Sequence, residues 1–239
     1  MIRRPLHAVL LLGLFVFPSG PVVAQNVTLD EGTFAVTMAD GAAGTESFTI
    51  RQAGAGIDAR VIAQARIQWA LAAGTRDVVP LLEARGGALF AYQVEISGDR
   101  REEIYLRVEG RRFVANVRSD AGEQQREFRA RPGSVLLEEG VAHQYFILGR
   151  VALAAEAAEV EVRPVPVLTP LAASLRSFEL VLGDPEPLVL GGQTVEARHL
   201  TLTSGEERHE VWVDAQGRVL RVEVPATGYV AVREAPPRS

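Results

Sequence analysis

Alternation of apolar and polar residues is the feature that most restricts the fold of this chain. In residues 60–71 every odd position is apolar, including Ile67 and Trp69, whereas four of the six even positions are Arg or Gln. Successive side chains of a strand point to opposite faces of a sheet, so this pattern predicts a half-buried β-strand. Ala, Arg and Gln also favour helices, and a helix over the same residues is the alternative.

The same period of two recurs along most of the chain. Residues 33–38 and 47–51 predict an opening hairpin whose apolar positions include Phe34 and Phe48. We therefore expect a mainly β (α+β) fold, with a curved antiparallel sheet or half-barrel packed on one principal helix. Further strands are predicted at residues 90–96, 104–108, 112–118, 127–131, 177–182, 188–190, 195–202, 207–213 and 219–224.

One stretch has helical spacing instead. Its apolar residues are separated by four, three and four positions, at Val141, Tyr145, Leu148 and Ala152. This spacing predicts a helix from Val141 to about Glu159, although Gly149 lowers the propensity locally. Residues 163–170 contain three prolines, which cannot continue a helix, so we expect an extended connection or an edge strand there.

The first 24 residues have the order of a secretory signal peptide. Two arginines precede an apolar run from Ala8 to Phe17, and small residues lead up to Ala24. The run is about half of the roughly 20 residues that a membrane-spanning helix needs, so we expect cleavage before Gln25 rather than an anchor. We divide the chain into a signal peptide at 1–24, one β-rich domain at 25–234 and a loose tail at 235–239.

Composition excludes several kinds of chemistry and indicates a compartment. The chain has no Cys and no Lys, so it cannot use a thiolate, a Schiff base or the lysine of a phosphate-binding loop. An exported chain without disulfides favours a bacterial periplasm. The net charge of −5 argues against binding to nucleic acid or to an anionic membrane.

The last two strands allow the most detailed assignment of faces. If Asp214 to Gly217 form a four-residue turn, Val213 pairs with Arg218, and apolar residues share one face while charges share the other. The pairs expected from this register are Val211 with Leu220, His209 with Val222, Glu210 with Arg221 and Arg208 with Glu223.

The histidines leave two arrangements open. His199 and His209 flank a turn near Ser204. A two-residue turn puts the two rings on opposite faces of the hairpin, whereas a three-residue loop at 204–206 puts both on the face of Val211. Because two ligands alone rarely hold a metal, we expect packed or rim histidines and no metal site.

Three segments resemble proteins of the bacterial periplasm: Gly32 to Arg51, His143 to Tyr145 and Trp212 to Val224. Together with the export signal and the predicted sheet, they resemble uncharacterised periplasmic domains that are similar to the lipoprotein-carrier barrels of the LolA and LolB type. In those carriers a curved sheet wraps over helices around an apolar cavity. The resemblance implies the same architecture here, with carriage of an apolar or lipid-like ligand as the implied activity.

No sequence motif indicates catalysis. The chain has no nucleophile-elbow motif around a serine, and Glu102–Glu103 and Glu138–Glu139 are interpreted as solvated turns and edges rather than a glycosidase pair. We therefore expect a non-enzymatic protein without a cofactor.

Two function classes follow from these observations. The first is a periplasmic protein that binds an apolar or lipid-like envelope ligand on the concave face of its sheet. The second is a structural or partner-binding envelope protein with a packed core and no ligand. The oligomeric state stays open. The candidate ligand-binding residues are Phe34, Phe48, Ile67, Trp69, His143, Tyr145 and His209.

Overall fold

The computed structural model describes residues 26–55, 59–157 and 162–238. The signal peptide and cleavage site expected at residues 1–25 lie outside these ranges. No helix in the described ranges combines the length and the hydropathy that a membrane crossing requires.

Eight strands form an antiparallel meander in the first half of the chain, and each pairs with the next. Residues 60–71 form a strand, so the helical alternative for them is wrong. The strands are β1 (Asn26–Thr37), β2 (Ala43–Ala53), β3 (Arg60–Leu71), β4 (Gly74–Arg85), β5 (Ala88–Gly98), β6 (Glu102–Glu109), β7 (Arg112–Ser119) and β8 (Gly122–Arg129).

Strand β4 has no counterpart in the sequence analysis. It buries Val78, Pro80, Leu82 and Ala84 on one face. Pro80 pairs with Val94 of β5, but the β3–β4 ladder is interrupted beside it, since proline has no N–H to donate. A proline inside a central strand is unusual, so the alternation of apolar positions around Pro80 is not readily recognised as a strand.

A second meander follows a short strand and the helix. The residues expected to be an extended connection or edge strand form β10, which lies next to the last strand of the sheet. The elements are β9 (Val135–Leu136), α1 (Tyr145–Glu156), β10 (Val162–Thr169), β11 (Ser174–Leu190), β12 (Gln193–Ser204), β13 (Glu207–Val213), β14 (Val219–Val224) and β15 (Tyr229–Arg233).

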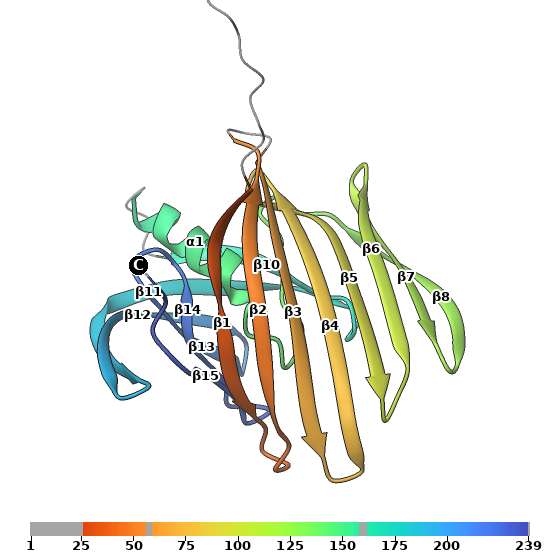
Figure 1. Cartoon of the computed structure of the whole chain (residues 1–239). Coiled ribbons are helices and arrows are strands. Elements are labelled where there is room, and N and C mark those ends of the chain that lie inside the picture. Colours follow the sequence, from red (N-terminus) through yellow and green to blue (C-terminus); the bar gives the residue numbers. More distant parts are fainter. Residues whose placement is uncertain (1–25, 56–58, 158–161, 239) are drawn as a thin grey trace, which may run out of the picture.

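The fifteen strands form one open, curved sheet in which the first and last strands of the chain meet near the middle. The order runs from β8 to β1 and then from β15 back to β9, and only the β9–β10 pair is parallel. Helix α1 lies on the inner side of the curve (Figure 1). This confirms the expected mainly β class with a curved sheet on one helix.

The sheet curls until its two halves face each other. Strand β9, at one end of the sheet, contacts β5 in the opposite half. Near the other end, Arg126 of β8 donates hydrogen bonds from Nη1 to the carbonyl oxygens of Pro170 (2.8 Å) and Leu171 (3.2 Å). Side-chain contacts, rather than backbone pairing, bridge the two ends.

Residues 134–149 run through the space that the sheet encloses. All of them are buried except Glu139. Apolar side chains from both meanders, from this interior segment and from α1 form one large core. A small second cluster of Leu190, Ala197 and Leu220, with Trp212 beside it, lies on the outer face of the second meander.

Helix α1 begins at Tyr145, four residues later than predicted. Val141 to Gln144 are buried but not helical, because other contacts hold them: the N–H groups of Ala142 and His143 donate to Glu46 of β2. The predicted end near Glu159 falls outside the described residues. Gly149 is required by close packing, since a Cβ there would lie 2.5 Å from the carbonyl oxygen of Gly217.

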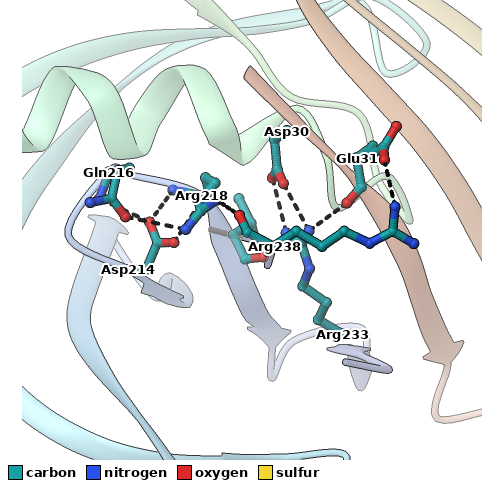
Figure 2. Close-up of polar contacts among 8 residues, drawn as sticks. Asp30, Glu31, Asp214, Gln216, Arg218, Arg233 and Arg238 are labelled. Atoms are coloured by element: carbon teal, nitrogen blue, oxygen red, sulfur yellow. Dashed lines mark hydrogen bonds and ion pairs between the residues drawn. The ribbon is translucent and has the colours of Figure 1, made fainter. Parts of the chain in front are cut away.

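A buried ion pair joins the first and last strands (Figure 2). Arg233 of β15 donates from its two terminal nitrogens to both oxygens of Asp30 on β1, at 2.9 and 2.8 Å, and both side chains are 2% exposed. Gly32 leaves room for the guanidinium, which a Cβ there would approach to 2.9 Å. Residues 235–238, expected to be loose, contact the same region, because the carbonyl oxygen of Arg238 accepts from Arg218 at 2.7 Å.

The register predicted for the last hairpin is wrong. The structure pairs Val211 with Val222 and Trp212 with Arg221, and a bulge follows at Val213–Val219. The carboxylate of Asp214 accepts from the N–H groups of Gln216 and Arg218 and from Arg218 Nε, so the turn is one residue longer than expected. Leu220 is the extra residue of this bulge, which lets Val219 and Val222 both face the large core while Leu220 lies in the second cluster on the outer face.

The predicted cross-strand charge pairs of this hairpin are also wrong. Glu210 lies opposite Glu223. Each glutamate instead pairs with an arginine two residues away on its own strand, Glu210 with Arg208 and Glu223 with Arg221.

Candidate functional site

A cleft of about 1020 Å³ opens at one end of the enclosed space. Its wall is built from β3, β4, β5, the interior segment, β10, β11 and β13 to β15. Most of the lining side chains are apolar or aromatic, as in ligand-binding clefts of comparable size.

Three of the seven candidate residues line this cleft, namely Trp69, Tyr145 and His209. The other four, Phe34, Phe48, Ile67 and His143, lie in the packed interior away from the lining. The rings of Phe34 and Phe48 stack with centroids 5.1 Å apart, and the Phe48 ring is 6.2 Å from that of His143. The structure therefore divides the seven residues between a cleft wall and a core.

Trp69 forms one wall because it occupies an inward-facing position near the end of β3. Its ring lies 6.3 Å from the ring of Tyr229 at a tilt of 54°. Gly140 of the interior segment packs against the indole, where a Cβ would come within 3.3 Å. Trp69 is buried at 6% exposure but has the cleft on one side.

A chain of hydrogen bonds runs through another part of the cleft wall. Tyr145 and His209 share a hydrogen bond of 2.6 Å at Nδ1, and the other ring nitrogen of His209 lies 2.9 Å from Glu207. Glu207 in turn pairs with Arg176. Neutral His209 accepts from the Tyr145 hydroxyl and donates to the Glu207 carboxylate, which satisfies all three side chains.

The pKa values in this chain are shifted by burial and charge. Burial lowers the pKa of His209, and the Glu207 hydrogen bond opposes this only in part. Burial acts to raise the pKa of Glu207, but hydrogen bonds from Arg176 and His209 outweigh it and leave the pKa lowered. Burial and the charge of Glu207 raise the pKa of Tyr145, so its hydroxyl stays protonated and is not an activated nucleophile.

The histidine arrangement follows the two-residue turn. Ser204 pairs with Glu207, and His199 lies opposite Trp212, so His199 is on the outer face while His209 points inward. The rings of His199 and Trp212 stack at 4.6 Å. In the described part of the chain, no three His, Asp or Glu side chains are grouped as metal ligands.

The first polar site of the interior is the Glu46 clamp, formed by Glu46, Ala142 and His143. The Glu46 carboxylate accepts from the N–H groups of Ala142 and His143 and from His143 Nδ1, each at 2.7 Å. The Glu46 and His143 side chains are fully buried, and only His143 Nε2 has no partner among the described residues. The clamp holds the interior segment against β2.

The second is the Glu138 cluster, formed by Glu138, Gln144 and Tyr92. Glu138 donates its backbone N–H to Gln144 Oε1 at 2.7 Å, and its own Oε1 accepts from the N–H of Leu171 at 3.0 Å. Among the described residues, Glu138 Oε2, Gln144 Nε2 and the Tyr92 hydroxyl have no hydrogen-bond partner. Glu138 and Tyr92 line the cleft, with exposures of 2% and 1%.

Burial raises the pKa of Glu138 to about 8, and the Leu171 hydrogen bond opposes the shift without cancelling it. At neutral pH this side chain is therefore a carboxylic acid rather than a carboxylate. The interpretation of Glu138–Glu139 as a solvated edge holds for Glu139, which is exposed, but is wrong for Glu138.

Glu46, Glu138 and Tyr92 are not among the site residues predicted from the sequence. A signal was available for Glu46, because it alternates in phase with Phe48 and Ile50 on the apolar face of its strand. Tyr92 likewise shares the buried face of β5 with Val94. Glu138 lies outside any regular element, so no periodicity marks it as buried.

The rim of the cleft carries both signs of charge. Arg76, Arg100 and Arg176 lie there with Asp40 and Glu207 and the exposed Glu139. Arg76 is paired with Asp99, and that hydrogen bond raises its pKa further. No single sign dominates the entrance, so the rim does not select strongly for an anion or a cation.

Compared with protein-family models, with curated proteins and with solved structures, the chain has no significant match. The resemblance to the lipoprotein carriers therefore stays a prediction, and the cleft is the observation that bears on function.

Proposed function

We propose that this protein is a non-enzymatic binding protein that holds an apolar or lipid-like ligand in the cleft beside Trp69. One observation carries the proposal: a cleft of about 1020 Å³ whose lining is mostly apolar. Water in contact with such a surface is displaced favourably by an apolar molecule, by roughly 25 cal/mol for each Å² covered.

The distribution of the candidate residues between the cleft and the packed core restricts which of them the proposed ligand can contact. Phe34, Phe48 and Ile67 are packed against protein on all sides, so the proposed ligand does not touch them. Trp69, Tyr145 and His209 supply the wall that it would contact.

The second candidate is a structural or partner-binding envelope protein without a ligand. It is favoured by the interior segment, which already fills most of the enclosed space with side chains from residues 134–149. In that case the cleft is only the part of the interior that the segment does not reach.

We also propose that the protein is exported to a bacterial periplasm, on the order of basic, apolar and small residues in positions 1–24. N-terminal sequencing of the protein purified from cells tests this. A start at Gln25 supports export, and an intact Met1 on a cytosolic product contradicts it.

Binding is tested by titrating the purified protein with N-phenyl-1-naphthylamine, whose fluorescence rises in apolar surroundings, and by native mass spectrometry of the protein from cells. Trp69→Ala is expected to weaken probe binding at least fivefold. Ile67→Ala is the matched control, because Ile67 lies on the same face of β3 but outside the cleft.

The two variants also differ in stability. Ile67→Ala is expected to lose about 2–5 kcal/mol without changing probe affinity, whereas Trp69→Ala loses less than about 3 kcal/mol because one side of the ring already faces the cleft. No probe binding, no co-purifying ligand and a severely destabilised Trp69→Ala would together overturn the proposal and leave the structural alternative.

A further inference from the structure

The Glu138 cluster carries more unpartnered polar atoms than a merely packed interior would hold. Buried polar groups are normally hydrogen-bonded, and an unpaired one is costly in a low-dielectric interior. Here Glu138 Oε2, Gln144 Nε2 and the Tyr92 hydroxyl are all unpaired within the described chain, and each side chain is at most 2% exposed.

The three groups belong to one site. Gln144 and Glu138 are joined by the hydrogen bond from the Glu138 N–H to Gln144 Oε1. Burial raises the pKa of Tyr92 well above its usual value, the charge of Glu138 adds to this, and an interaction with the Gln144 side chain, whose geometry falls short of a hydrogen bond, opposes it. Tyr92 therefore lies close to both.

Existing contacts decide which atoms are donors. Gln144 uses its oxygen to accept from the Glu138 N–H, which leaves the NH₂ group unpaired. Glu138 uses Oε1 to accept from the Leu171 N–H, so in the neutral acid the proton is placed on the unpaired Oε2. With the Tyr92 hydroxyl, the cluster holds three hydrogen-bond donors, of which those of Glu138 and Tyr92 belong to residues that line the cleft.

Resting on the proposed function, we infer that the Glu138 cluster binds a hydrogen-bond acceptor of the ligand, so that the ligand is an apolar molecule carrying an uncharged carbonyl oxygen. An ester, amide or ketone oxygen has two lone pairs and can accept from two of these donors at once. The mixed charges of the rim fit an uncharged ligand.

The test compares two naphthalene probes. One is 6-propionyl-2-(dimethylamino)naphthalene, a ketone whose emission shifts when its carbonyl accepts a hydrogen bond, and the other is N-phenyl-1-naphthylamine, which has no carbonyl. We expect Tyr92→Phe and Glu138→Met each to weaken the ketone about fivefold and to shift its emission toward that of the unbonded carbonyl. Binding of the second probe is expected to change less than twofold.

Two matched controls test whether the change in ketone affinity is specific to the polar groups of the cluster. Tyr105→Phe removes the hydroxyl of a side chain that is 46% exposed and lies outside the cleft, and it is expected to leave the ketone affinity unchanged. Glu138→Gln keeps an uncharged donor at the same position and is expected to retain most of the affinity.

The outcomes separate the two proposals. If neither probe binds, the proposed function fails. If both bind but Tyr92→Phe and Glu138→Met leave the ketone's affinity and emission unchanged, ligand binding stands and the acceptor site is overturned, with water satisfying the three donors instead.

Discussion

The Glu46 clamp and the Glu138 cluster both include buried residues of the interior segment, but their polar atoms are satisfied to different degrees. Glu46 accepts three hydrogen bonds, each of 2.7 Å. The Glu138 cluster leaves three polar atoms without a partner in the described chain. A fully paired buried carboxylate positions the backbone. A buried carboxyl group that is incompletely paired and lies at a cleft can instead form a hydrogen bond to a ligand or to water.

The largest effect is expected at the clamp. Glu46→Ala removes the partner of two backbone N–H groups and of His143, and it leaves a void in the core, so we expect a loss of about 3–5 kcal/mol. Urea unfolding followed by tryptophan fluorescence measures it. A loss below about 1 kcal/mol would show that the interior segment is held by apolar packing alone.

The next effect is a pH dependence at Glu138. Because its pKa is raised from 4.5 to about 8, the folded state binds this proton more tightly than the unfolded state. The stability it contributes is fully present below about pH 4.5 and is lost as the pH rises toward 8, by at most a few kcal/mol. The charges that act on it are Glu102, Glu139 and Arg126.

Glu138→Gln isolates this group. The variant is expected to match the parent chain near pH 4 and to become progressively more stable than it up to about pH 8, in urea unfolding at a series of pH values. A difference that stays constant across this range would mean that Glu138 keeps an ordinary pKa.

A smaller loss is expected where a cleft hydroxyl is paired. Tyr145→Phe leaves His209 Nδ1 buried without its 2.6 Å partner, which is expected to lower stability by about 1–2 kcal/mol. Thermal unfolding of the variant checks this. An unchanged midpoint of thermal unfolding would indicate that water, rather than the Tyr145 hydroxyl, is the hydrogen-bond partner of His209.

The smallest effect is expected at the unpaired hydroxyl. Tyr92→Phe removes a buried group that has no partner among the described residues, so stability is expected to stay within about 0.5 kcal/mol or to rise. A loss equal to that of Tyr145→Phe, measured in the same way, would remove the distinction between the two sites.

Local pattern was enough to predict the fold class and several faces. Alternation in residues 60–71 and in the opening hairpin places Trp69, Phe34 and Phe48 on the inner face, where the structure has them. These predictions succeed because side-chain direction in a strand depends only on the parity of the position. The same parity links Glu46 to the buried face of β2.

The candidate site was predictable only in part. Trp69, Tyr145 and His209 were identified from aromatic or polar character near apolar runs, and they line the cleft. Glu138 was not, because its burial depends on residues from distant strands that close over an irregular segment.

By itself, then, the sequence determined most of the strands and the one helix, which depend on neighbouring residues, but it left both a two-residue and a three-residue turn open between His199 and His209. Only the tertiary structure decided the pairing of β1 with β15, the bulge at Leu220 and the neutral state of Glu138. Each of these depends on which distant groups come into contact: Arg233 reaching Asp30, two clusters on opposite faces burying Val219 and Leu220, and loss of water around one carboxyl group. Such contacts follow from the way the whole sheet curls, which no local window of sequence contains.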